Sequence, residues 1–457
     1  MGIDGFRELF GELIDDAKNI VDISSYAGKI VIVDGHLQLH RMRIGKIGKC
    51  AEIINNDGKN VSHVYDLFSH VLSLVFKRIM PFYVFDGGIS VEKLDEAVQR
   101  SEDKCKAYKK CQEIEDKTSC EYIRQAKRCY RVTATVISDC VQLLELLGIP
   151  YVVCEKEADQ QCVALYNYYS EKMPDRMAGI ITDDTDILAF GGQKILKNFS
   201  LKTKTAIEIK RQNVISLLRK KSNLIRMQKG LNPVKITHDS FIDLAILMGT
   251  DYLKKSGCKI IGIKPNLLHE VFVVNDLDVN RTVRELKKMS GVTVSKNFSE
   301  SFVKIKNVYV RSMVFHPQDI SIVPRIKRTD KLIDLLCNGI IGIDKELITN
   351  QVNMFTACIQ VFLIDLFPDY LNPTKELIDY LNTPPKQTRF DPNAFCLRHA
   401  GITILNVLNN MYKHKYNNDN DNFANFKSFK RRHDKKKRKI ENAAVVDHSK
   451  FHLVSVY

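Results

Sequence analysis

Short apolar runs that end in acidic residues restrict the fold of this chain more than any other feature. They occupy residues 29–35 (KIVIVDG), 81–88 (PFYVFDGG), 149–159 (IPYVVCEKEAD) and 179–186 (GIITDDTD). Nearly continuous apolar runs of this length are typical of strands buried on both faces of a parallel sheet. Helical patterns lie between them, as at residues 131–147, where apolar residues recur every three or four positions. This alternation predicts an α/β fold in which helices flank a doubly wound parallel sheet.

Each predicted strand ends on carboxylates, and a further acid follows in a helix-loop-helix pattern at residues 238–275. The acids are Asp34, Asp86, Glu157, Asp159, Asp184, Asp186 and Asp251. Within roughly 10 Å of one another they would repel by several kcal/mol unless divalent cations neutralised them. Oxygen ligands suit Mg²⁺, for which Mn²⁺ can substitute, and two such ions about 4 Å apart serve many nucleases. The acids therefore predict a site with two Mg²⁺ ions that acts on a phosphate ester.

The local spacing of the acids agrees with this interpretation. Asp184 and Asp186 are two residues apart at a strand end, so both side chains can face one side. Glu157 and Asp159 would diverge by about 200° within a regular helix, so we place them at a turn and its first helical residues. Asp183 faces the other side of its strand and is interpreted as a cap or a supporting group. For Asp34 or Asp86 in isolation, a helix cap or a solvated loop residue is the favoured explanation. For the acids taken together, that explanation is weak.

The charge balance points to a polyanionic partner. The chain has 69 Lys and Arg against 54 Asp and Glu, a net charge of +15, and nucleic acid is the natural candidate. The alternative is that the excess Lys keeps the surface soluble. The 12 cysteines include no C-x-x-C pair, so we expect reduced thiols without a zinc site or a disulfide framework. No apolar stretch is long enough to span a bilayer, which predicts a soluble protein without a membrane partner.

The chain divides into five segments. Residues 1–110 and 111–200 contain the predicted strands, with exposed helices expected at 89–130, and residues 201–330 contain a basic stretch followed by the helix-loop-helix pattern. Residues 331–415 have helical patterns to which the sequence assigns no role. Residues 416–457 combine Asn/Asp repeats with a run of basic residues, a composition typical of a disordered tail.

At this point an ordered set of motifs resembles a known family. The motifs are MGIDGF at the N-terminus, VIVDG, FYVFDGG, EKEAD, TDDTD and MGTDY. They resemble the flap endonuclease and 5′ exonuclease family of structure-specific 5′ nucleases, the XPG-type nuclease superfamily, over about residues 1–275. The resemblance implies a PIN-like nuclease core, a helical arch over the site and a helix-loop-helix that grips duplex DNA. The acids above are the metal ligands that it implies.

The resemblance also implies roles for residues outside the acidic set. Lys93 and Arg100 stand at the positions of the arch and, almost two helical turns apart, share one helix face. They are expected to clamp the scissile phosphate and to stabilise charge in the transition state. The alternative, that both are ordinary exposed cations, is disfavoured. Lys104 continues that face as a DNA contact. Gly2 is expected near the site, because family members tuck the processed N-terminus there.

Three departures from the family pattern stand out. His40 occupies a position where the family often has an aromatic residue that stacks on a base. The hairpin reads Gly262-Ile263-Lys264 in place of Gly-Ile-Gly, so Lys264 supplies charge where the backbone would approach a phosphate. No motif for docking a sliding clamp is present, and we expect a monomer. The basic run at 430–439 is either a nuclear localisation signal or a DNA tether, which favours the nucleus over the cytosol.

Several functions remain open at this stage. A flap endonuclease that acts on 5′ flaps, branched or ended duplex in DNA replication or repair is favoured over a 5′→3′ double-strand exonuclease. A bubble cutter is disfavoured by the short spacer between Asp86 and the helix that starts near Arg131, and a junction resolvase stays open. Outside catalysis, an inactive DNA-binding scaffold is opposed by the complete acid set. A phosphatase for small esters would share the metals but would not need the charge of +15.

Overall fold

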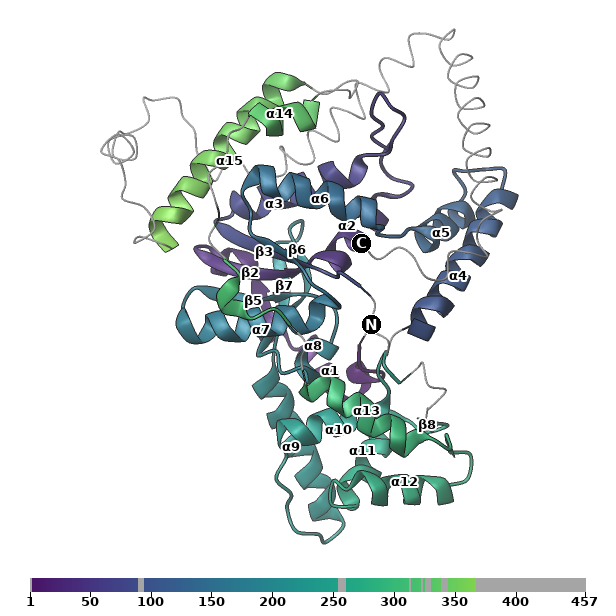
Figure 1. Cartoon of the computed structure of the whole chain (residues 1–457). Coiled ribbons are helices and arrows are strands. Elements are labelled where there is room, and N and C mark those ends of the chain that lie inside the picture. Colours follow the sequence, from purple (N-terminus) through teal and green to yellow (C-terminus); the bar gives the residue numbers. More distant parts are fainter. Residues whose placement is uncertain are drawn as a thin grey trace.

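A seven-stranded sheet forms the centre of the computed structural model, which describes residues 2–88, 94–253, 260–311, 314–321, 324, 330–337 and 344–366 (Figure 1). The strand order is β1-β7-β6-β5-β2-β3-β4. The bounds are β1 Ile20–Asp22, β2 Lys29–Asp34, β3 Ile79–Phe85, β4 Tyr151–Val153, β5 Met177–Ile181, β6 Lys194–Ser200 and β7 Thr205–Lys210. The four apolar runs of the sequence form β2, β3, β4 and β5, which confirms those four strands.

The sheet is mixed, so the prediction of a wholly parallel sheet was wrong at one edge. Strands β6-β5-β2-β3-β4 are parallel, whereas β7 pairs antiparallel with both β6 and β1. Only the short turn at 201–204 joins β6 to β7, and a connection of that length forces an antiparallel pair. Both strands mix charged or polar residues with apolar ones, and both are only partly buried. This half-exposed pattern explains why the search for continuous apolar runs missed them.

Helices cover both faces of the sheet (Figure 1). Helices α3 (Ser62–Val75) and α6 (Ala134–Leu147) lie on one face with α2 (Gly35–Lys46), and α7 (Ala158–Lys172) packs against β2, β3 and β5 on the other. The short α8 (Asp186–Ala189) follows β5, and α1 (Phe6–Asp15) contacts α9 and α11. The predicted helix at 131–147 is confirmed as α6. It begins at Ala134 because Thr133 caps it, and it ends where Gly148 adopts a φ of 69°.

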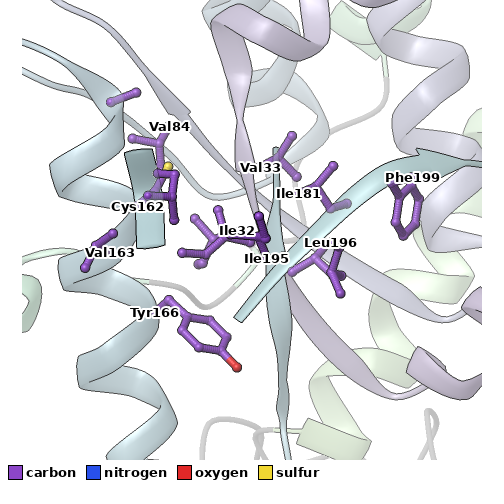
Figure 2. Packing of buried hydrophobic residues seen from close by; sticks show 14 of the residues in the cluster. Ile32, Val33, Val84, Cys162, Val163, Tyr166, Ile181, Ile195, Leu196 and Phe199 are labelled. Atoms are coloured by element: carbon purple, nitrogen blue, oxygen red, sulfur yellow. The ribbon is translucent and has the colours of Figure 1, made fainter. Parts of the chain in front are cut away.

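The core holds the strand ends in position. Ile30, Val31, Ile32 and Val33 of β2 have no exposed surface. Figure 2 shows Ile32 among side chains of neighbouring strands and of α7, including Ile195 and Tyr166. Each fully buried aliphatic side chain of this kind contributes roughly 1.5–3 kcal/mol. Because β2 is buried from Ile30 to its end, Asp34 has a fixed position.

Two helices form a separate projection beside the sheet (Figure 1). They are α4 (Leu94–Glu113) and α5 (Cys120–Cys129), which pack against each other and are called the arch below. Most of their side chains are exposed, while Ala107 and Gln125 are buried. Ser119 caps α5 through a hydrogen bond from the N–H of Tyr122. The expected exposed helices at 89–130 are therefore confirmed, although residues 89–93 lie outside the described residues.

A second group of helices follows β7. It contains α9 (Arg211–Gln228), α10 (His238–Met248), α11 (Pro265–Val274), α12 (Val279–Lys288) and α13 (Phe298–Val310), with a small antiparallel sheet of β8 (Ile260–Ile261) and β9 (Thr293–Val294). Helices α10 and α11 confirm the predicted helix-loop-helix, of which residues 254–259 lie outside the described residues. The predicted basic stretch forms α9, which packs against α11 and α1.

The described part of the C-terminal segment is helical, as predicted. Helix α14 (Asp330–Cys337) packs on α6, and α15 (Lys345–Leu366) packs on α3, so both extend the layer that covers the sheet (Figure 1). The hydroxyl of Tyr65 in α3 donates a hydrogen bond to the carbonyl of Leu336. The predicted tail at 416–457 and the remainder of 331–415 lie outside the described residues. None of the helices within the described ranges is both long and apolar enough to cross a bilayer.

Candidate active site

Asp34 and Asp86 leave neighbouring parallel strands, and each is held by the start of a helix. Oδ1 of Asp34 accepts a 3.1 Å hydrogen bond from the N–H of Leu37 and thereby caps α2. Oδ1 of Asp86 accepts a 2.6 Å bond from the N–H of Ala158, the first residue of α7. Helix N-termini stabilise negative charge. Asp34 is therefore both a helix cap, the simpler interpretation of its sequence, and part of the acidic edge.

Glu157 and Asp159 flank the start of α7, where their spacing placed them. Glu157 is the N-cap with extended backbone angles, and Asp159 lies in the first turn. The hydroxyl of Tyr252 donates a 2.6 Å hydrogen bond to Oε2 of Glu157. Burial, and after it the charges of Glu157 and Asp159, raise the pKa of Tyr252 well above its usual value. Both acids therefore lie near the loop that contains Asp251.

The loop after β5 joins two strands of the site. The hydroxyl of Thr182 donates a 3.1 Å hydrogen bond to Oδ2 of Asp34 and accepts one from the N–H of Asp184. Oδ1 of Asp184 in turn accepts a 2.9 Å bond from the N–H of Asp186. Asp183 points elsewhere, as predicted: its Oδ2 lies 2.9 Å from Nη1 of Arg41. Thr182 thus holds the Asp184–Asp186 turn against the end of β2.

The acids create a buried concentration of negative charge. Five of the seven are buried, namely Asp34, Asp159, Asp184, Asp186 and Asp251. Burial, and after it the charges of Asp86 and Asp184, raise the pKa of Asp34 to about 7. Ionising all of these carboxylates is therefore costly in the absence of a counter-ion.

The donor set fits hard divalent cations. The acids offer carboxylate oxygens at the edge of the sheet, and the raised pKa of Asp34 is a cost that a bound cation would remove. Within the described ranges, no three His, Cys, Asp or Glu side chains are arranged around one point as ligands of a single ion. Each ion would then complete its coordination with water or phosphate oxygens, which is usual for Mg²⁺.

The arch reaches this acidic edge through Arg100. Nη2 of Arg100, on α4, lies 2.9 Å from Oδ2 of Asp251, whose side chain is 5% exposed while that of Arg100 is 51% exposed. Lys104 is one turn further along α4, and burial followed by the charges of Arg131 and Arg100 lowers its pKa. Arg100 and Lys104 therefore lie together as predicted. Lys93 lies outside the described residues.

The N-terminal segment connects three parts of the site. The N–H of Ile3 donates a 3.0 Å hydrogen bond to Oγ1 of Thr185, and the N–H of Asp4 donates a 2.8 Å bond to the carbonyl of Gly249. Gly2 has a φ of 91°, and a Cβ there would lie 2.5 Å from Oδ1 of Asp184. The segment therefore lies against the acidic turn, which agrees with the predicted position of Gly2.

Two family models match the chain in order around this geometry. The model of the XPG N-terminal domain matches residues 1–107, and that of the XPG I-region matches residues 148–251. Both parts of the acidic site thus match models of the XPG family. Together the two matches contain all seven acids, and the arch lies at and beyond the end of the first match.

Proteins whose sequences are similar to this chain include flap endonucleases. Flap endonuclease 1 of Nematostella vectensis is 27% identical over 346 residues, which cover 74% of this chain and 82% of that protein. Flap endonuclease 1-A of Xenopus laevis is 31% identical over 253 residues, which cover 55% of this chain and 61% of that protein.

Solved structures share the fold. Flap endonuclease-1 from Methanococcus jannaschii is similar with a TM-score of 0.50 and 20% identity, covering 75% of this chain and 96% of that one. The catalytic core of Rad2 in complex with a DNA substrate is similar with a TM-score of 0.51 and 22% identity, covering 78% of this chain and 100% of that one.

His40 lies at the base of the arch. It belongs to α2, and its ring centroid is 5.8 Å from that of Tyr130, with the rings inclined at 34°. Burial, and next the charges of Lys104 and Arg100, lower the pKa of His40. The imidazole is therefore a neutral ring beside two cations near neutral pH.

The hairpin residues Gly262 and Lys264 lie between β8 and α11. Gly262 has a φ of 88°, and a Cβ there would lie 2.0 Å from the carbonyl oxygen of Gly291. Lys264 is exposed and is the N-cap of α11, with Pro265 as the first helical residue. A Cβ on Gly5 would lie 2.2 Å from Cγ of Pro265, so the N-terminal segment also touches this hairpin.

Three residues of the site were missed by the sequence interpretation. Thr182 and Tyr252 each lie within two residues of an acid, and that adjacency was a signal that could have identified them. Tyr130 carried no such signal, because it is 90 residues from its partner His40 and ends an otherwise basic stretch. Only the tertiary structure brings it to α2.

Proposed function

We propose that this chain is a structure-specific 5′ nuclease that cuts 5′ flaps or branched DNA by metal-dependent hydrolysis of a phosphodiester. One observation carries the proposal: Arg100 of the arch meets the buried acid Asp251 at 2.9 Å, beside the acidic edge. This arrangement presents a cation and a set of carboxylate ligands to one phosphate. Similarity to flap endonucleases supports the same reaction class.

The acids would hold Mg²⁺, two ions per site, and Mn²⁺ would substitute. The residues that would do so are Asp34, Asp86, Glu157, Asp159, Asp184, Asp186 and Asp251. Bound divalent cations lower the pKa of a water molecule and neutralise the charge that develops on a phosphate. The protein contributes the positions of these oxygens, since α2 holds Asp34 and α7 holds Asp86.

Residues of the arch would bind the scissile phosphate. The guanidinium of Arg100 is half exposed and is a planar donor that suits phosphate oxygens. Lys104 adds a second cation on the same helix, and Lys93 is proposed as a third. Their charge would stabilise the pentacoordinate phosphate more than the ground state, which is how a fixed donor accelerates the reaction.

Duplex DNA would bind at the second group of helices. The N-terminus of α11 presents backbone N–H groups beside the exposed Lys264, and helix N-termini are favourable sites for phosphate. Helix α9 adds basic residues to the same group of helices. The N-terminal segment joins this hairpin to the acidic turn, so the duplex would be positioned relative to the ions.

The test is a product map on defined DNA. A 5′-labelled flap, a nicked duplex, a bubble and a four-way junction are incubated with the protein in Mg²⁺ and in EDTA. Asp184→Asn removes an acid of the site. Asp116→Asn is the matched control, because Asp116 is exposed and accepts its hydrogen bonds from Thr118 and Ser119 within the arch.

Cleavage at the base of the flap that is lost in EDTA and in Asp184→Asn, but kept in Asp116→Asn, is the expected result. Release of mononucleotides from the 5′ end would establish the alternative of a 5′→3′ exonuclease. DNA binding without metal-dependent cleavage of any substrate would refute the catalytic proposal and leave a DNA-binding scaffold. The monomeric state, the absence of clamp docking and residence in the nucleus stay predictions.

A further inference from the structure

Two cysteines face each other between the helices of the arch. Sγ of Cys111, on α4, lies 3.9 Å from Sγ of Cys129, the last residue of α5. Both side chains are partly buried. The thiol of Cys129 also lies 3.9 Å from the carbonyl oxygen of Lys104. The two cysteines therefore lie within the arch, and Cys129 is close to the backbone of Lys104. Lys104 is one helical turn after Arg100.

From this geometry we propose that Cys111 and Cys129 are a site of reversible oxidation, at which an intramolecular disulfide locks α4 to α5. A disulfide requires a sulfur separation of about 2.05 Å, so the two sulfurs must approach by roughly 2 Å. Rotation of the two side chains can supply much of this movement, because α4 and α5 already pack against each other (Figure 1).

The oxidant is a low-molecular-weight disulfide such as oxidised glutathione. The thiolate of Cys111 attacks one sulfur of the oxidant, which forms a mixed disulfide and releases one reduced thiol. The thiolate of Cys129 then attacks the sulfur of Cys111 and releases the second reduced thiol. Two protein thiols are oxidised, one small disulfide is reduced, and the protons pass from the protein thiols to the two released thiols.

The environment of Cys129 sets the rate of the second step. Burial, and next the neighbouring Cys111, raise the pKa of Cys129 to about 11. Because the thiolate is the nucleophile, closure is slow near neutral pH and accelerates as the pH rises. The disulfide therefore forms under sustained oxidation and is removed by excess reducing thiol.

The cross-link would restrain the residues that the arch brings to the site. Helix α4 contains Arg100 and Lys104, and Cys129 precedes Tyr130, which packs against His40. A bond between Cys111 and Cys129 closes this hairpin covalently and limits how far the helices can separate. The effect on DNA cleavage rests on the proposed function, whereas formation of the disulfide does not.

The first test is chemical. The reduced chain is incubated with oxidised glutathione at pH 7.5 and at pH 9, quenched, and mapped by mass spectrometry without reduction. The variants are Cys111→Ser and Cys129→Ser, and the matched controls are Cys105→Ser and Cys120→Ser, since both control cysteines are exposed in the arch. A peptide that joins Cys111 to Cys129, formed faster at pH 9 and kept in both controls, is expected.

The second test measures whether the disulfide restrains the helices of the arch. Trypsin cleavage within residues 94–129 should slow by about tenfold or more in the oxidised chain, and dithiothreitol should restore it. Cleavage of a 5′ flap should slow in the same samples and recover with them. No joined peptide, or pairing through Cys105 or Cys120, would overturn the proposal. A chain that forms the disulfide but cuts no DNA would instead refute only the proposed function.

Discussion

His40 on α2 packs beside Tyr130, the residue that follows α5, with ring centroids 5.8 Å apart. This contact joins the base of the arch to the helix that Asp34 caps. His40 also lies near Arg100 and Lys104: burial, and next the charges of these two residues, lower the pKa of His40. Aromatic rings next to cations are the elements with which proteins bind single-stranded nucleic acid.

Replacing Tyr130 should weaken substrate binding more than chemistry. A contact between two rings contributes about 0.5–1.5 kcal/mol, so Tyr130→Leu should raise the KM for a 5′ flap by roughly 2- to 13-fold at a similar kcat. Tyr130→Phe keeps the ring and is the control. Equal KM values for the two variants and the unchanged protein would show that the ring does not support His40.

Arg100 should act mainly on the rate of the chemical step. Removing one preorganised donor from a developing anion costs roughly 10²–10³ in rate, so Arg100→Ala should lower the single-turnover rate by that factor. Arg124→Ala is the matched control, because Arg124 is an exposed arch residue paired with Glu121. A similar loss in both variants would indicate an effect of net arch charge and argue against a specific contact.

Gly262 should be intolerant of a side chain for two separable reasons. Its positive φ disfavours L residues, and a Cβ would overlap the carbonyl of Gly291. Gly230 has a φ of 69°, but a Cβ there would meet no atom of the described residues within 4 Å, so Gly230→Ala reports the backbone cost alone, about 1 kcal/mol. Unfolding in urea should show that Gly262→Ala lowers the free energy of unfolding more than Gly230→Ala does. Gly262→Ala should also weaken the binding of duplex DNA. Equal losses would contradict the overlap.

The buried His70 should make stability depend on pH. Its Nδ1 lies 2.7 Å from the hydroxyl of Tyr83, and burial, followed by the charges of Arg41 and Lys46, lowers its pKa to about 3. The unfolded chain binds a proton near pH 6.5 whereas the folded chain stays neutral. The contribution of His70 to the free energy of unfolding is therefore complete above pH 6.5. It is lost as the pH falls toward 3, by up to about 1.4 kcal/mol per pH unit.

Unfolding in urea at pH 7.5, 6.5 and 5.5 measures this dependence. Because other groups titrate in the same range, the comparison is between the unchanged protein and His70→Gln, which removes the titrating ring. The variant should lose less stability than the parent between pH 6.5 and pH 5.5. Parallel curves would mean that His70 does not control stability in this window.

Much of the fold was predictable because it depends on local patterns. Continuous apolar runs indicated β2, β3, β4 and β5, and the spacing of apolar residues before Gly148 indicated α6. The acids followed from the same patterns, since parallel strands end at one edge of a sheet. Strands β6 and β7 escaped prediction, because their mixture of charged, polar and apolar residues resembles an exposed segment.

The sequence alone therefore determined the parallel strands β2, β3, β4 and β5, the acids at their ends and the helix α6. The tertiary structure decided which distant side chains meet: Arg100 with Asp251, Tyr252 with Glu157, His40 with Tyr130 and Cys111 with Cys129. Local periodicity fixes which way a side chain points from its own helix or strand. Contacts across long stretches of chain depend on how whole helices pack, and no single segment of sequence contains that information.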